Sequence, residues 1–330
     1  MAYNALTGVK VRVLMYHGIS SKDVCGGIEN YYGYNVSLQE FTKHLLDLRH
    51  HCNVISLNDA LCGRKLSTTR TNVVITFDDG YENNYHNAFT LLQQYSLPAV
   101  FSLPTAFVFD RKPLWNDLIE YAINKSPRKH VRIFWGGHRR DFVIGDIAGK
   151  LALFNWVFQE CTRMAQALRD SLIANCLDEL GLRVSADEMF VNEDYRPLNI
   201  EQLELMAGSG IAEFASHSVR HYVLPRCDAI GRRAELVESK ERIESVTKLP
   251  CGVFCVPAGA YDRELLDDAF SCGYEYVLTS DMGDADITKR VINRNCIRSR
   301  RGLHEFADIA YGPLLDVVAM ARRILRRPAY

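Results

Sequence analysis

Short apolar segments alternate with stretches of helical periodicity along most of this chain. Apolar runs with the length of buried strands lie at 11–16, 73–78, 99–104, 211–216, 252–257, 274–280 and 290–297. Helical spacing of apolar residues predicts helices at 38–50, 87–95, 200–210, 232–247 and 263–273. Because strands that alternate with helices form parallel βαβ units, we predict an α/β protein with an irregular (β/α)7-type barrel.

Residues 113–195 interrupt this alternation. Two helical stretches, 114–129 and 150–181, flank the segment 131–144, which has the pattern of a small hairpin. We interpret the region as a helical cap insertion between two βα units. Since the sequence contains no repeat, low-complexity tract or evident linker, we predict a single domain over 1–330 with its core at about 11–298.

Composition and charge narrow the functional classes. The chain has 330 residues, 48% of them apolar, and a net charge of −1, which does not favour nucleic acid as a partner. It lacks an apolar run long enough to cross a membrane and an N-terminal export signal. The ten cysteines are scattered without paired zinc-binding spacing, so we favour buried free thiols over disulfides and predict a cytoplasmic location.

Several predicted strands end in polar or turn-forming residues. These strand ends carry Tyr16 and His17, Asp78 and Asp79, His217 and His221, and the turn Pro257–Ala258–Gly259. The carboxyl ends of parallel strands gather at one edge of a sheet or barrel, which is where sites of α/β proteins form. We therefore expect these groups to converge.

The pair Asp78–Asp79 is costly at the end of a buried strand. Adjacent carboxylates raise each other's pKa unless a cation lies between them or one takes part in proton transfer. His217 and His221, four residues apart, would lie on one face of a helical turn. With a carboxylate as third ligand they suit a tetrahedral metal ion whose fourth position holds water. Taken singly, these motifs are better explained by solvated histidines and an ordinary Asp-Gly turn. Their coincidence at strand ends favours a metal site.

The same segments resemble a known family. TFDDGYENNYHNAFTLLQQYSLPAVFSLPT, GIAEFASHSVRH and VFCVPAGAYD resemble the polysaccharide deacetylases of carbohydrate esterase family 4, the NodB homology domain. VLMYHGIS is similar to the start of the permuted branch, in which a Tyr-His pair on the first strand replaces a C-terminal histidine. The resemblance implies a distorted barrel and the metal-dependent removal of N-acetyl groups from sugars.

The resemblance also implies a role for each matching residue. It places one divalent metal ion, zinc by preference, on Asp79, His217 and His221. It makes Asp78 the catalytic base, His17 the catalytic acid and the backbone amide of Ala258 a donor to the oxyanion, with Arg294 orienting the base. Around them we expect substrate contacts from Tyr16, Tyr81, Pro257, Gly259 and Tyr261.

One position departs from the family pattern. Ala258 stands where the family usually has an aromatic residue, so one wall of the sugar pocket is missing. Tyr261, Trp115 or Trp135 could replace it, although packing of the insertion against the barrel is the favoured explanation of these tryptophans.

The C-terminus leaves two alternatives open. A helix at about 304–328 ends in Arg322, Arg323, Arg326 and Arg327, which suits peripheral contact with an anionic membrane or a docked helix whose arginines complement its dipole. On the first alternative the substrate is an intracellular N-acetylated sugar, an oligosaccharide or a lipid-linked glycan at the inner membrane face. Deformylation, O-deacetylation and an inactive carbohydrate-binding barrel remain alternative functions.

Overall fold

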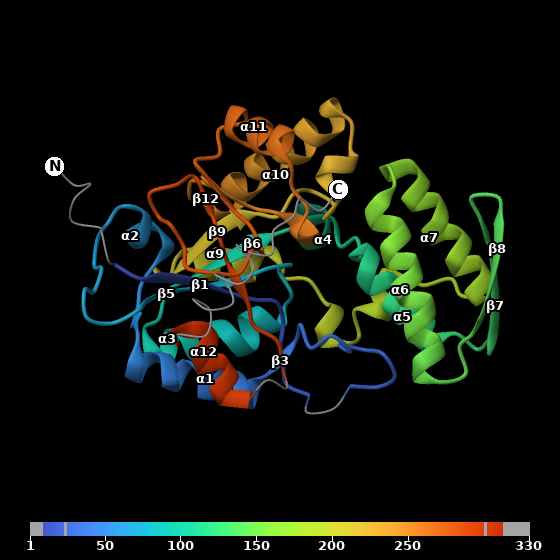
Figure 1. The fold of residues 1–330 in the computed structure, drawn as a ribbon, viewed down its shortest axis with the longest axis horizontal. Coiled ribbons are helices and arrows are strands. Elements are labelled where there is room, and N and C mark those ends of the chain that lie inside the picture. The colour runs from blue at the N-terminus through green and yellow to red at the C-terminus, as the bar shows by residue number, and fades with distance from the viewer. Residues whose placement is uncertain (1–8, 23–24, 300–301, 313–330) are drawn as a thin grey trace, which may run out of the picture.

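A curled parallel sheet forms the centre of the molecule (Figure 1). The structure is a computed structural model that describes residues 9–22, 25–299 and 302–312. The sheet order is β12 (Val291–Ile292), β11 (Tyr276–Leu278), β10 (Val253–Cys255), β9 (Ala212–Ser216), β6 (Ala99–Leu103), β5 (Asn72–Phe77), β1 (Val11–Tyr16) and β13 (Asn295–Cys296), and β4 (Asn53–Val54) also pairs with β5. The predicted α/β class and irregular barrel are confirmed. Among the described residues β12 and β13 do not pair with each other, so the barrel is open.

The central strands are apolar because both faces of the sheet are covered. β1 and β5 are buried along their whole length and pair from Val11↔Asn72 to Tyr16↔Phe77. The strand predicted at 290–297 is instead divided into β12 and β13. The division occurs because Arg294, between them, turns its fully buried side chain toward the end of β5.

Helices cover the barrel between the strands. They are α1 (Leu38–His51), α2 (Leu57–Leu61), α3 (Thr90–Tyr95), α4 (Thr105–Asp110), α9 (Ile200–Ala207), α10 (Ala229–Thr247), α11 (Arg263–Ser271) and α12 (Gly302–Ala310), and a π-helical segment, Asn84–Phe89, leads into α3. Side-chain caps begin many of them, such as Ser37 at α1 and Asp262 at α11. Periodicity did not predict α2 and α4, because five or six residues are too few to show it.

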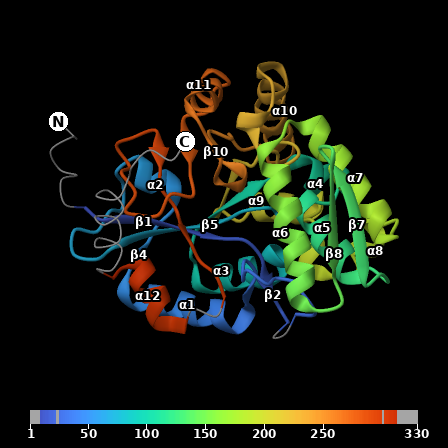
Figure 2. The ribbon, with the colours of Figure 1, turned by 45° about the vertical axis from the view of Figure 1, so that its right-hand side comes forward.

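The region 113–195 forms a separate helical layer beside the barrel (Figure 2). It contains α5 (Trp115–Lys125), α6 (Ile147–Arg163), α7 (Gln166–Leu180), the short α8 (Ala186–Met189) and a hairpin of β7 (His130–Trp135) and β8 (His138–Val143). These elements bury a hydrophobic cluster of their own, which includes Ile119, Leu153, Val157, Leu172 and Cys176 and is called the insertion core below.

The ends of the described barrel are joined through one buried arginine. Arg12 of β1 donates from its guanidinium to the carbonyl groups of Asp308, Ile309 and Gly312 at 2.9 Å, and to the Asp284 carboxylate at 2.7 Å. The last turn of α12 is thereby fixed to the first strand. α12 ends at Ala310, and Tyr311 and Gly312 are not helical, so the continuous helix predicted at about 304–328 is wrong; the arginines of its predicted basic end lie outside the described residues.

The membrane and thiol predictions have different outcomes. Within the described part of the chain, no helix has the length and hydropathy to cross a bilayer. All ten cysteines are free, and five of them are buried, which confirms free thiols over disulfides. The cytoplasmic location and the membrane contact remain predictions.

Candidate active site

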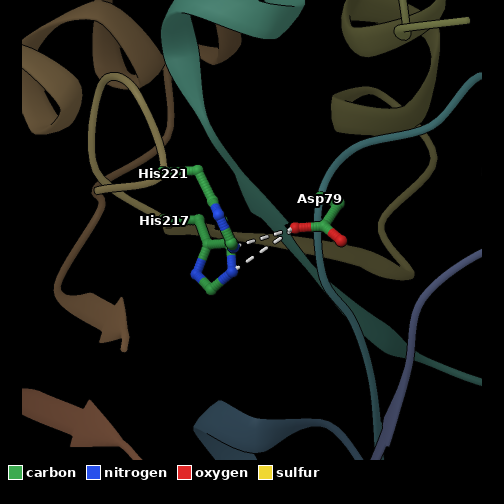
Figure 3. A group of neighbouring side chains, drawn as sticks. All are labelled: Asp79, His217 and His221. Atoms are coloured by element: carbon green, nitrogen blue, oxygen red, sulfur yellow. Dashed lines mark ion pairs between the residues drawn. The ribbon is translucent and has the colours of Figure 1, made fainter. Parts of the chain in front are cut away.

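Three predicted metal ligands meet at the ends of β5 and β9 (Figure 3). Asp79 lies just beyond β5, and His217 directly follows β9. Asp79 Oδ1 is 3.6 Å from His217 Nε2 and 3.4 Å from His221 Nε2, and all three side chains are buried. The candidate ligand atoms lie within 4.8 Å of one another, so a single ion could contact all three.

The prediction that a helical turn brings the two histidines together is wrong. Residues 217–221 form a loop in which Ser218 and His221 have left-handed φ angles of 64° and 53°. Glu235 of α10 stabilises this loop by accepting hydrogen bonds from the amides of Val219 and Arg220, each at 2.9 Å. The histidine rings still converge, with centroids 4.8 Å apart, but loop geometry achieves this.

Hydrogen bonding determines which nitrogen of His217 faces the aspartate. His217 Nδ1 lies 2.8 Å from the carbonyl oxygen of Cys255, which can only accept, so Nδ1 carries the proton. Burial lowers the pKa of His217 and of His221 to about 4, so both rings are neutral near pH 7. The unprotonated Nε2 of His217 therefore faces a carboxylate oxygen with no proton between them.

This arrangement fits a bound cation. Asp79 Oδ1 is buried and has no hydrogen-bond partner among the described residues. Two acceptor atoms that face each other in a buried site repel, and a buried acceptor without a partner is unfavourable. A divalent ion between Asp79, His217 and His221 would remove both costs, and carboxylate and imidazole are ligands that zinc accepts.

The neighbouring carboxylate has a different partner. Asp78 accepts two hydrogen bonds from Arg294, at 2.7 and 2.8 Å, and both side chains are buried. Burial alone would raise the pKa of Asp78, but Arg294 and His217 outweigh it and hold that pKa well below its ordinary value. Asp78 is therefore ionised and held in a fixed orientation beside the three candidate ligands.

His17 and Ala258 line the same cavity. His17 follows β1 and packs against Tyr34, with ring centroids 4.7 Å apart, and Arg298 donates to the Tyr34 hydroxyl at 2.9 Å. Ala258 lies in the short turn Pro257–Gly259 with a φ of 53°, a conformation that is uncommon for a residue other than glycine. At Gly259, where φ is 67°, an added Cβ would lie 2.2 Å from Ser280 Oγ, so this turn requires glycine there.

The cavity has a volume of about 680 Å³ and extends from the candidate ligands to the helical insertion. Tyr81 and Gly259 line it, as predicted for substrate-binding residues. The prediction that Tyr16 contacts substrate is wrong. Its ring is fully buried between Phe41 and Phe77, and its hydroxyl lies 3.3 Å from His44 Nδ1.

Two further predicted contacts lie off the cavity lining. Pro257 is buried, and Tyr261 is exposed and donates to Asp281. Of the two tryptophans proposed to replace the missing aromatic wall, Trp115 lines the cavity, whereas Trp135 belongs to the hairpin.

Several residues that build the site carry no sequence signal of their own. Glu235 is one of many charged residues on α10, and Tyr34 and Arg298 lie far apart in the chain. Trp115 lines the cavity and also contacts the loop 217–221: its indole Nε1–H donates to the carbonyl group of His221 at 3.2 Å. Such contacts depend on tertiary placement, so spacing along the chain does not reveal them.

A second cluster of possible ligands already has a cation. Cys25, Glu29 and Asp194 lie close enough together to hold an ion. The Lys22 ammonium, however, is 3.2 Å from Glu29 and 3.4 Å from Asp194. The Lys22 ammonium therefore already occupies the side of this cluster where a metal ion would contact the two carboxyl groups.

Comparison with known proteins gives one family. The family model described as polysaccharide deacetylase matches residues 65–121 and 171–277. The Bacillus subtilis protein YxkH, whose name places it among the polysaccharide deacetylases, is 21% identical over 306 residues, which span 92% of this chain and 76% of that protein.

Solved structures share the fold. The Streptococcus pyogenes deacetylase PplD, in complex with acetate, has 17% identity and a TM-score of 0.59, with 92% of this chain and 99% of PplD covered. The Bacillus cereus polysaccharide deacetylase BC0361 has 18% identity and a TM-score of 0.58, with 91% and 69% covered. At such identities the structural likeness shows the fold alone.

Proposed function

Because this chain belongs to the polysaccharide deacetylase family, we propose that it is a metal-dependent hydrolase that removes N-acetyl groups from an acetamido sugar in a polysaccharide or glycan intermediate. One observation carries the proposal. Asp79 Oδ1, buried and without a described hydrogen-bond partner, faces the imidazoles of His217 and His221, whose low pKa values keep them neutral. Membership in the permuted branch stays a prediction.

The metal ligands proposed here are Asp79, His217 and His221. When bound, a divalent ion supplies Lewis-acid polarisation of the amide carbonyl and a lowered pKa for the attacking water. Two sets of hydrogen bonds hold the two imidazoles in place: the one from His217 Nδ1 to the Cys255 carbonyl, and those that Glu235 accepts from the loop 217–221, called the ligand loop below. Zinc is the ion that this ligand set favours.

Asp78 is proposed as the general base. It is ionised, it lies next to the ligands, and its side chain is fixed by Arg294. It would accept the proton of the water as the oxygen attacks the acetamido carbon. Arg294 is a positioning residue on this proposal, because it acts on substrate through Asp78.

His17 and the turn at Ala258 complete the proposed chemistry. An amine leaves far more readily than an amide anion, so the nitrogen of the sugar must be protonated as the C–N bond breaks. His17 lines the cavity and would donate that proton. The backbone amide of Ala258 would stabilise the developing oxyanion.

The test combines metal content with acetate release. Elemental analysis of the purified protein should find about one zinc or similar ion per chain, and His217→Ala with His221→Ala should remove it, since three protein ligands are reduced to one. Acetate and formate release from N-acetylated, N-formylated and O-acetylated sugars then separates deacetylation from its alternatives. His138→Ala, on the exposed hairpin, is the control and should keep both metal and activity.

If the protein binds zinc and sugar but releases neither acetate nor formate, the carbohydrate-binding alternative is favoured. A wild type that binds no metal after incubation with zinc would contradict the proposal.

A further inference from the structure

We propose that the helical insertion forms a carbohydrate subsite in which Phe158 and Gln159 of α6 bind the sugar residue next to the one that loses its acetyl group. The inference rests on the proposed function, because it assigns a further part of the substrate of the same site. α6 lies in the interval 122–170, between the two ranges that the family model matches.

One face of α6 is directed to the cavity. Phe154, Asn155, Phe158 and Gln159 line it, and their spacing of one and four residues places them on one side of the helix. Leu153 and Val157 are fully buried in the insertion core and supply the packing of α6. The folding of α6 therefore does not require a phenylalanine at position 158, where 36% of the residue is exposed.

The aromatic rings on this side form a continuous wall. Phe158 stacks on Trp115 with centroids 5.3 Å apart, and Phe154 lies 6.0 Å from Phe158 and 6.3 Å from Tyr32. The Tyr32 hydroxyl donates to Asn155, which joins the loop before α1 to α6. Aromatic faces can pack against the C–H face of a sugar ring, and small-molecule pockets combine such surfaces with a few polar groups. Asn116 and Gln159 provide amides beside these rings.

The subsite is continuous with the proposed catalytic residues. The cavity that contains Asp79 and His17 also contains the α6 face, so one oligosaccharide could contact both. The hydrogen bond from Trp115 to the His221 carbonyl links the aromatic wall directly to the ligand loop. A bound chain would thus have one residue at the candidate metal ligands and a neighbour against Phe158.

The charges of this wall restrict the neighbouring sugar. Asp117 and Glu120 line the cavity and accept hydrogen bonds from Tyr81 and Tyr195, each at 2.8 Å. Among the described lining residues, Arg298 is the one with a guanidinium or ammonium group, and it packs over Tyr34. Burial raises the pKa of Asp117 well above its ordinary value and that of Glu120 to about 7, so Glu120 repels an anionic sugar only above about pH 7. Because the described lining has one guanidinium to pair with an anionic sugar, the proposed occupant is a neutral or amine-bearing hexosamine.

The test compares substrates of different length. Acetate release is measured for N-acetylglucosamine and for its β-1,4- and β-1,6-linked trimers, with wild type, Phe158→Ala, Gln159→Ala and the control Phe134→Ala. Phe134 is a 60% exposed phenylalanine on the hairpin of the same insertion, away from the cavity lining. We expect the ratio of kcat/KM for the trimer to that for the monosaccharide to fall about tenfold in Phe158→Ala and about threefold in Gln159→Ala. The ratio should stay at the wild-type value in Phe134→Ala.

Calorimetric binding separates failure of the subsite from failure of the proposed function. If the wild type releases no acetate from any substrate, the proposed function fails, and the Kd of each trimer is then measured on the same inactive proteins. The subsite predicts about tenfold weaker trimer binding in Phe158→Ala than in Phe134→Ala. Three outcomes would overturn the subsite. Phe158→Ala could leave both trimer binding and the kcat/KM ratio unchanged, or Phe158→Ala and Phe134→Ala could show equal losses. The third outcome is that neither trimer binds to the wild type. Since Phe158 and Gln159 are both exposed, their truncation should leave Tm within a few degrees of the wild type.

A charged ligand, measured at pH 8 where Glu120 is ionised, checks the argument from the charges of the cavity lining. A hyaluronan tetrasaccharide, in which glucuronate alternates with N-acetylglucosamine, should bind at least about tenfold more weakly than the neutral trimers. Equal affinity would contradict the charge restriction.

Discussion

The barrel and the helical insertion bury their hydrophobic cores in different ways. In the barrel, strands such as β1 and β5 are buried on both faces, and charged groups, among them Asp78 and Arg294, are enclosed where the strands end. The insertion core gathers the apolar faces of α5, α6 and α7 and one face of a hairpin. Asp78 and Arg294 are paired with each other, whereas Asp79 Oδ1 has no hydrogen-bond partner among the described residues. The insertion contributes an aromatic wall and also buries Asp117 and Arg169.

The barrel and the insertion therefore have different roles in the proposed function. The barrel holds the groups proposed for chemistry, while the insertion shapes the part of the cavity farther from them. The insertion core is a cluster distinct from the barrel core, and Leu118 and Val184 pack against both, so we expect changes in the wall to leave the strands in place. Among the described contacts, the bond from Trp115 to the His221 carbonyl is one place where the two regions are directly connected.

The largest expected effect is on the barrel side. Arg294→Met leaves the buried Asp78 carboxylate without its partner, and we expect a loss of about 3–5 kcal/mol in the free energy of unfolding. Urea unfolding measures it. The control Arg242→Met removes a more exposed pair with Asp110 and should cost less than about 1 kcal/mol. Equal costs would mean that burial of the ion pair is not what distinguishes the barrel end.

A cavity in the insertion core should act locally. Leu172 of α7 is fully buried there, and Leu172→Ala should cost about 2–5 kcal/mol in the stability of the insertion. Hydrogen exchange should show faster exchange in α5, α6 and α7 while β1 and β5 keep their protection. Leu168→Ala, at a position 55% exposed on the same helix, is the control and should change little. Loss of protection in β1 and β5 as well would show that the two cores unfold together.

A smaller effect depends on pH. Burial raises the pKa of Glu120 from 4.5 to about 7, and the Tyr195 hydroxyl opposes only part of that rise. Between these pH values the folded protein holds a proton on Glu120 that the unfolded chain has lost. Glu120 therefore contributes to the free energy of unfolding at low pH, and this contribution is lost as the pH rises through about 7.

Glu120→Gln removes this titration. Between pH 5 and pH 7.5, the free energy of unfolding should fall by about 2 kcal/mol less in Glu120→Gln than in the wild type. The control Glu204→Gln, at an exposed position, should show the same fall as the wild type. Identical pH dependence in all three proteins would show that Glu120 keeps its ordinary pKa.

The smallest effect tests the connection between the regions. Trp115→Phe keeps an aromatic ring against Phe158 but loses the hydrogen bond to His221, so we expect about 1 kcal/mol of lost stability and a several-fold weaker zinc affinity. Chelator competition measures the zinc affinity. Trp156 is the matched control, because its buried Nε1 has no hydrogen-bond partner among the described residues, and Trp156→Phe should not weaken zinc binding.

The strand ends were predictable from sequence because buried strands leave a strong pattern. Continuous apolar runs located β1, β5 and β9, and the polar residues just beyond them supplied the candidate ligands. Tyr16 shows where this reasoning went wrong. Neighbouring residues at a strand end point to opposite faces, so of Tyr16 and His17 only one could line the cavity, and the other packs in the core.

Other features required tertiary structure. His217 and His221 converge through a loop with two left-handed residues, which their spacing did not reveal. Phe158 and Gln159 carry no motif, and on an isolated helix they resemble ordinary surface positions. Their relation to the cavity follows from the packing of α6 on α5, which no pattern along the chain encodes.

Arg12 has a consequence for where this fold can be shortened. The family resemblance ends near residue 298, yet the guanidinium of Arg12, buried in the first strand, is capped by carbonyl groups of residues 308, 309 and 312. Removal of the chain after residue 301 would leave that cation inside the protein with most of its acceptors gone. The segment 302–312 therefore stabilises β1, and we expect a chain that ends at residue 301 to be less stable than one that includes this segment.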